Sequence, residues 1–299
     1  MRATALLAGR RRLRERDLRA IPPAPLAFRQ LAARRSGQAG LALAAVVVAF
    51  VVFAPVAVGK DPNSQDLLAQ LEGPSSSHLL GTDQFGRDIF ARVAEGGRRS
   101  LMGATLILGI TFGVGLFLGV VAGLTGGIVD SVLMRVVDLF LALPSLIIAI
   151  ALVGALGPSF TNLVIALVAA AWPFYARIAR GFTLNASLRA DVIAARLAGV
   201  GRLRILLGHI VPGAASRLLV VVSLDYGFAI LALAGLSFLG LGAQPPAADW
   251  GTMLAESRNF FTAAPWLLLV PGIAIVLAAT AANLVAEALR DLADEPSSV

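Results

Sequence analysis

Residues 101–124 read LMGATLILGITFGVGLFLGVVAGL, an apolar run without a charged side chain. A helix needs about 20 such residues to cross the hydrocarbon core of a bilayer. Five further apolar segments follow the same rule, at residues 40–58, 139–156, 163–178, 218–241 and 264–286. The pattern predicts an all-α membrane protein with six transmembrane helices.

The composition supports this fold class. Hydrophobic residues make up 58% of the chain and charged residues only 14%, which is too little polar surface to cover a soluble globule of 299 residues. The net charge of +7 does not indicate nucleic acid as a partner, because the basic residues lie beside apolar segments and not among stacking aromatic side chains. Membrane lipid is the expected surrounding.

The distribution of basic residues predicts the orientation. Residues 1–36 are basic and contain several prolines, which predicts a cytoplasmic N-terminal tail before a first transmembrane helix at 37–58. Alternation then places the loop 59–99 outside, the loop 180–216 inside and a C-terminal tail at 291–299 inside. Most of the 25 basic residues are cytoplasmic in this arrangement, as the positive-inside rule requires. A cleaved signal peptide is not expected, because the first apolar run is long enough to span.

Several chemistries are excluded by residue type. The chain has no cysteine, and its two histidines, His78 and His209, are far apart in sequence, so neither a disulfide nor an imidazole metal cluster is expected. Lys60 is the single lysine, and no phosphate-binding loop of the form GxxxxGK[ST] precedes it. We therefore expect no catalytic residue, bound cofactor or metal site here. If transport uses ATP, another subunit must bind it.

Proline and glycine mark irregularities within the predicted spans. Pro144, Pro173 and Pro271 interrupt three of them and predict kinks or breaks, either as packing features or as gating hinges. Glycine pairs such as Gly113 with Gly119 or Gly123 predict close approach of helix backbones.

The loop between the fourth and fifth predicted spans contains DVIAARLAGVG at residues 191–201. Ser187 is a plausible helix N-cap, Asp191 suits a first helical turn, and Gly199 and Gly201 are stop signals. A short helix at about 188–201 would carry a smooth face of small residues with arginines around it. Such a helix either fits a groove on another protein or lies on anionic lipid.

This loop resembles the EAA loop of binding-protein-dependent ABC importer permeases, whose pattern is Glu-Ala-Ala, then Gly, then a downstream Ile-hydrophobic-Pro. Ile193 stands where the family has its Glu, so a salt bridge made by that Glu is not carried over. The resemblance implies a helix that couples the chain to an ATPase subunit. The residues assigned to this coupling are Asp191, Ile193, Ala194, Ala195, Arg196, Ala198, Gly199, Arg202 and Pro212.

A second resemblance narrows the family. Residues 78–88, HLLGTDQFGRD, resemble the GTDxxGRD segment of dipeptide and oligopeptide permeases of the C-subunit type. Residues 237–251 resemble the SFLGLGxQPPxxxWG segment of the same family. Together with the EAA-like loop, these motifs occur in the family's order and cover most of residues 78–291.

The external motif is rich in turn-forming and charged residues. Arg87, flanked by Asp83 and Asp88, can form an ion-paired knot outside the membrane. The knot either fixes the loop against the helices or contacts an extracytoplasmic binding protein. Trp250 in the second external loop is expected either to anchor that loop at the membrane boundary or to contact the substrate. The residues assigned to the external site are Gly81, Thr82, Asp83, Gly86, Arg87 and Asp88.

The resemblance implies a type I ABC importer permease domain at residues 100–290, in the bacterial plasma (inner) membrane, with both termini cytoplasmic. It implies a second homologous permease, two ATPase subunits that use ATP and Mg, and an extracytoplasmic substrate-binding protein. This chain would form half of a channel for di- or oligopeptides or similar small solutes. Nickel or another non-peptide solute is the alternative cargo.

Asp225 is the acidic residue that the predicted fifth span contains. A charge at the centre of a bilayer costs roughly 2.5–3.5 kcal/mol on insertion scales, so the side chain is expected to face the bundle interior or water. It either has an internal structural partner or lies on the translocation path. As a proton or ion relay it would instead indicate a secondary transporter driven by an ion gradient. A membrane scaffold without transport would contain no such polar path.

Overall fold

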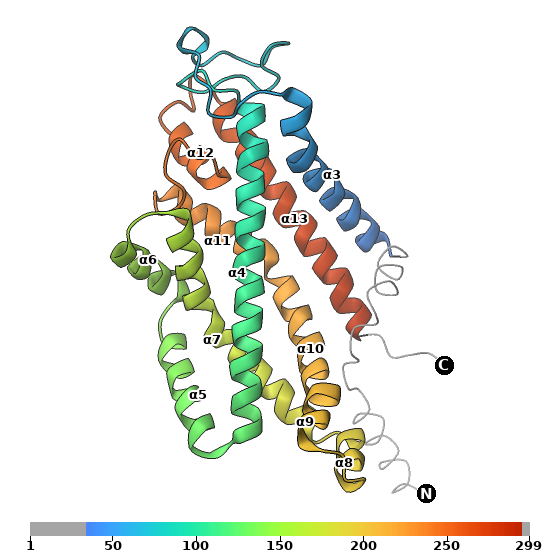
Figure 1. Cartoon of the computed structure of the whole chain (residues 1–299). Helices are drawn as coiled ribbons and strands as arrows, with labels where there is room; N and C mark the ends of the chain where they lie inside the picture. The colour runs from blue at the N-terminus through green and yellow to red at the C-terminus, as the bar shows by residue number, and fades with distance from the viewer. Residues whose placement is uncertain (1–33, 295–299) are drawn as a thin grey trace, which may run out of the picture.

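The computed structural model describes residues 34–294. Within this range the chain is a bundle of helices, and its only β-type pairing is an isolated bridge between Thr82 and Asp88 (Figure 1). The longer helices are α3 (Arg35–Val58), α4 (Ile89–Thr125), α5 (Gly127–Leu141), α6 (Ser145–Leu156), α7 (Phe160–Ser187), α10 (Val211–Leu224), α11 (Tyr226–Phe238) and α13 (Trp266–Asp294). The short ones are η1 (Leu67–Ala69), α8 (Ala190–Leu197), α9 (Arg202–Ile205), η2 (Leu206–Ile210) and α12 (Trp250–Ser257).

Five helical stretches in residues 34–294 are long and apolar enough to cross a membrane, and counting the bent pair of α5 and α6 as one span gives six. The predicted six-span fold is therefore confirmed. Helix α4 runs through the middle of the bundle along α7, and α3 lies beside α13 on one flank (Figure 1). The predicted tails fall largely outside the described residues, at 1–33 and 295–299.

Two predicted spans are built differently from the prediction. The third is broken: α5 ends at Leu141, Pro144 is the N-cap of α6, and the two helices meet at 88°. The fifth, predicted at 218–241, is divided at Asp225, whose backbone (φ −89°, ψ 1°) ends α10 and precedes α11. The spanning stretch there is Arg202–Leu224, and α11 is a shorter apolar helix. By contrast, Pro173 and Pro271 lie inside continuous helices.

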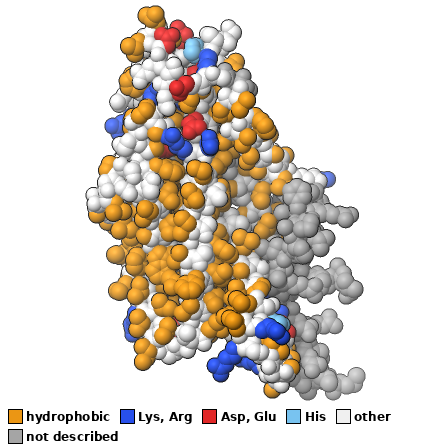
Figure 2. Space-filling view, viewed as in Figure 1, with side chains coloured by type: hydrophobic (Ala, Val, Ile, Leu, Met, Phe, Trp, Pro, Cys, Tyr) orange, Lys and Arg blue, Asp and Glu red, His pale blue; other side chains and the backbone are white. Residues whose placement is uncertain are grey.

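The external loop predicted at 59–99 ends at Asp88, since α4 begins at Ile89. The carboxylate of Asp88 caps this helix by accepting a hydrogen bond from the Ala91 N–H at 3.1 Å. Charged residues in its first turns, such as Arg92, lower the local hydropathy, so the hydropathy pattern placed the start of this helix too late. Figure 2 shows the resulting surface, with an apolar body and charged side chains gathered toward its two ends.

Helices α4 and α7 approach closely along a glycine face of α4. A Cβ atom at Gly119 would lie 2.5 Å from the Ala176 carbonyl oxygen, and one at Gly115 would lie 2.7 Å from the Tyr175 Cβ. The predicted role of Gly119 and Gly123 is confirmed, but Gly113 was the wrong partner, because a Cβ there would meet nothing within 4 Å. The contact face consists of Gly115, Gly119 and Gly123.

We expect Gly119→Val to destabilise the fold by about 1–3 kcal/mol, because the added atoms force α4 and α7 apart in a close-packed interior. Gly113→Val is the matched control on the same helix, in open space. Denaturant unfolding of the purified chain in mixed micelles measures both. Equal stability of the two variants would contradict the close approach.

Candidate functional site

The short helix predicted at about 188–201 corresponds to α8, which is shorter than expected, at Ala190–Leu197. Ser187 was wrong as its N-cap, because Ser187 is the last residue of α7 and Arg189 precedes α8. Asp191 lies in the first turn as predicted, where its carboxylate accepts hydrogen bonds from Arg189 at 3.0 and 3.2 Å. A negative charge suits this end of a helix, where free N–H groups point outward.

Gly199 ends α8. Its φ of +76° lies in the left-handed region, and the N–H groups of Ala198 and Val200 donate to the carbonyls of Ala194 and Ala195 at 2.9 and 3.0 Å. These bonds satisfy the last carbonyls of the helix in the way that glycine C-caps do. The chain then turns at Gly201 into α9.

One buried residue fixes α8 to the bundle. Val192 is fully buried and packs with Ala186 at the end of α7 and with Ile205 and Ile210 before α10. This small core attaches α8 to the end of α7 and to the residues that precede α10.

The opposite side of α8 is exposed. Leu197 is 85% exposed and Ile193 45% exposed, so apolar side chains accompany the predicted small residues on this surface. Ala195 is the exception among the assigned residues, since it is partly buried against Val192 and its neighbours. We call the exposed set the α8 surface: Asp191, Ile193, Ala194, Arg196, Leu197, Ala198, Gly199 and Arg202. Pro212 is exposed as well, in the first turn of α10.

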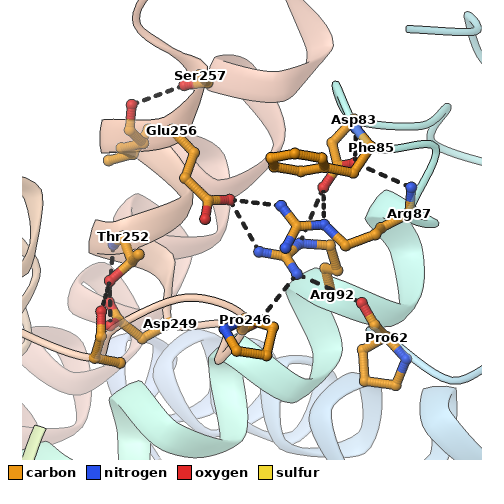
Figure 3. Close-up of polar contacts among 12 residues, drawn as sticks. Pro62, Asp83, Phe85, Arg87, Arg92, Pro246, Asp249, Thr252, Glu256 and Ser257 are labelled. Atoms are coloured by element: carbon orange, nitrogen blue, oxygen red, sulfur yellow. Dashed lines mark hydrogen bonds and ion pairs between the residues drawn. The ribbon is translucent and has the colours of Figure 1, made fainter. Parts of the chain in front are cut away.

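At the end of the bundle opposite α8, three buried charged side chains and the partly buried Glu256 form one cluster, drawn in Figure 3. The Arg87 guanidinium donates to Asp83 at 2.5 Å and to Glu256 at 2.9 Å, and Arg92 donates to the same Glu256 oxygen at 3.0 Å. Arg92 also lies 3.4 Å from Asp83. Two positive and two negative charges therefore balance, and the cluster joins the external loop, α4 and α12.

The predicted knot differs in one partner. Arg87 pairs with Asp83 as predicted, but Asp88 pairs with Lys60 at 2.8 Å and with His78 at 3.0 Å. Burial raises the pKa of Asp88, but the hydrogen bonds from Lys60, the Ala91 N–H and His78 outweigh burial and lower this pKa below its usual value. Arg92 and Glu256 were missed, because no local spacing connects residues 164 positions apart.

The remaining residues of the external motif shape the loop. Gly81 and Gly86 have φ values of +78° and +70°, and a Cβ at Gly86 would collide with the Asp66 backbone. The Thr82 hydroxyl donates to the Ala69 carbonyl at 2.5 Å and accepts from the Glu72 N–H at 2.9 Å. Trp250 is not a membrane-boundary anchor: it is 1% exposed, and its Nε1 donates to the Val93 carbonyl at 2.9 Å.

Between the two ends, a cavity of about 300 Å³ lies among α4, α7, α11 and the bend between α5 and α6. Its walls are largely apolar and aromatic, and Asp225 and Tyr175 line it. The Asp225 carboxylate accepts a hydrogen bond of 2.6 Å from the Tyr175 hydroxyl. Asp225 thus has an internal partner and also borders a cavity. Among residues 34–294, no group of three His, Cys, Asp or Glu side chains is placed to hold a metal ion.

Comparison with known proteins shows the family to which this chain belongs. A profile of the family described as binding-protein-dependent transport system inner membrane component matches residues 115–295. The chain belongs to this permease family. As a member, it is the permease subunit of an ABC importer, a multi-pass inner-membrane protein that works with a substrate-binding protein and ATPase subunits.

The relatives of this permease are named for different transported solutes. It is 40% identical to the probable D,D-dipeptide transport system permease protein DdpC of Escherichia coli K12, over 83% of this chain and 84% of that one. It is 37% identical to the dipeptide transport system permease protein DppC of Alkalihalophilus pseudofirmus, over 92% and 90%. It is also 40% identical to the nickel transport system permease protein NikC of E. coli K12, over 78% and 84%. Family membership does not support the ion-gradient or scaffold alternatives.

Proposed function

We propose that this permease forms half of an ATP-driven import path for di- or oligopeptides, and that partner ATPases dock on the α8 surface. The observation that carries the proposal is the attachment of α8: one side is buried through Val192 against the end of α7 and the residues that precede α10, and the other exposes apolar and basic side chains. Burying Leu197 and Ile193 in a groove of the ATPase would provide hydrophobic contact energy, and the arginines would set the orientation.

The proposed mechanism is mechanical. ATP and Mg bind to the two ATPase subunits, and closure of that pair moves α8. Val192 packs in one core with Ala186 at the end of α7 and with Ile210 just before α10. The displacement therefore reaches α7, which lines the central cavity, and α10, whose C-cap Asp225 lies on the cavity wall. The permease then switches between outward and inward openings.

The exposed wall of the central cavity favours an assembly with a second permease subunit. Phe174 and Phe228 line the cavity and are both largely exposed on the single chain, at 45% and 59%. A homologous permease facing this side would cover them and complete the path. We therefore propose an assembly of two permeases, two ATPases and one substrate-binding protein.

The external loop is the proposed contact for the binding protein. The charge cluster connects this loop to α4 and α12, and four apolar side chains remain exposed on it, with Leu68 at 97%. They are Leu67, Leu68, Leu79 and Phe85. The arginine-rich α8 end is the proposed cytoplasmic side, so the N- and C-terminal tails are proposed to be cytoplasmic too.

Peptide cargo is favoured over nickel by the cavity walls, which are apolar and aromatic around one carboxylate and so suit an organic solute. Nickel remains the second candidate because of the 40% identity to a nickel permease.

The test is uptake into proteoliposomes that contain this permease, its partner permease and both ATPases, with the binding protein outside. We expect labelled dialanine to accumulate with ATP and Mg inside the vesicles and to be unaffected by ionophores that collapse ion gradients. Radioactive Ni²⁺ is the competing cargo. Uptake by this chain alone, abolished by an ionophore, would overturn the proposal.

A further inference from the structure

The carboxylate of Asp225 is only partly used within the chain. Oδ2 accepts the Tyr175 hydrogen bond, whereas Oδ1 accepts none from any residue between 34 and 294 and is reached by solvent. Asp225 precedes α11, yet its side chain does not cap that helix. Within the same range the carboxylate forms no ion pair, so its charge remains available to a ligand.

The surroundings of this carboxylate are those of a small binding site. The cavity volume of about 300 Å³ is at the lower end of the range for small-molecule pockets. Phe140, Phe174 and Phe228 line it, and aromatic faces attract cations as well as apolar groups. A carboxylate in apolar surroundings at membrane depth is stabilised by an opposite charge.

We infer that the cavity binds the ammonium group of the transported solute, with Asp225 Oδ1 as acceptor and Tyr175 holding the carboxylate in place. The aromatic and aliphatic walls contact the rest of the solute. This inference rests on the proposed function, because it places the cargo's α-amino group in the translocation path. In this inference Asp225 selects for a positively charged group. The shape of the cavity alone does not provide such selection.

The first test measures charge selectivity without transport. Since the chain has no cysteine, Ser145→Cys introduces a single thiol into the cavity lining. The solubilised chain is labelled with methanethiosulfonate reagents carrying either a quaternary ammonium or a sulfonate, and Ser64→Cys on the exposed external loop normalises their rates. We expect the cation-to-anion rate ratio at the cavity thiol to fall about tenfold when Asp225→Asn is added, equivalent to about 1.4 kcal/mol. An unchanged ratio, or a thiol that neither reagent reaches, would overturn the inference.

The second test is dialanine uptake by the assembled transporter. Asp225→Asn is expected to lower uptake about tenfold while ATP hydrolysis stimulated by the loaded binding protein is retained, and Asp225→Glu is expected to keep most uptake. Asp291→Asn, an exposed carboxylate paired with Arg34, is the control. Normal uptake by Asp225→Asn would refute the inference, and so would equal losses in the Asn and Glu variants, which would indicate a packing role. If the unaltered transporter moves no dialanine, the peptide proposal fails, and the labelling ratio still decides whether the cavity attracts cations.

Discussion

Replacing Gly199 with valine is expected to uncouple ATP hydrolysis from uptake while the chain still folds and assembles. The φ of +76° is a conformation that costs an L residue roughly 1–2 kcal/mol, and more for a β-branched side chain. A Cβ at Gly199 would meet nothing within 4 Å, so the added side chain creates no clash inside the chain. The backbone relaxes instead, and the end of α8 changes direction.

The measurement is the number of dialanine molecules imported per ATP hydrolysed in proteoliposomes. We expect this ratio to fall about tenfold in Gly199→Val. A tenfold loss corresponds to about 1.4 kcal/mol, here the contact energy that α8 loses with the ATPase when its end changes direction. Two controls isolate the backbone as the cause. Gly199→Asn should keep most coupling, because Asn tolerates the left-handed region, and Gly201→Ala has open space and an ordinary φ of −59°. Normal coupling in Gly199→Val would exclude α8 as the lever.

The hydropathy pattern predicted which segments are apolar, but not where a span bends. Pro144 breaks its span and Pro173 does not, although both follow the same chemical rule. The difference lies in packing, since Pro173 is buried in α7, which packs along α4, whereas Pro144 lies exposed at the bend between α5 and α6. Asp225 likewise divides a continuous apolar segment, because a backbone conformation at one residue leaves no signal in mean hydropathy.

The candidate sites were predictable to the extent that their contacts are local. The αL turn at Gly199 follows from glycine after a short helix, and the Asp83–Arg87 pair spans four residues. Trp250 was misassigned because an aromatic beside a proline turn suits both a membrane boundary and a buried core. Its burial against Val93 depends on how α12 folds back onto α4, which sequence spacing does not contain.

The external charge cluster has the largest expected effect on stability. Arg92→Met would leave Asp83 and Glu256 facing Arg87 alone, with one buried negative charge unpaired. Breaking a buried pair in this way costs about 3–5 kcal/mol. Denaturant unfolding in mixed micelles measures the loss. Arg99→Met is the matched control on the same helix, because Arg99 is partly exposed and its 3.5 Å pair with Glu95 contributes about 0–1 kcal/mol.

A double variant separates the unpaired charge from the lost side-chain packing. Arg92→Met combined with Glu256→Gln removes one charge of each sign and leaves Arg87 paired with Asp83 at 2.5 Å. If the unpaired carboxylate causes the destabilisation, the double variant will be more stable than Arg92→Met alone. If both lose the same stability, the arginine acts through packing and through its contacts to the Pro62 and Pro246 carbonyls. Recovery would mean that charge balance holds the external loop in the position from which it presents its apolar side chains.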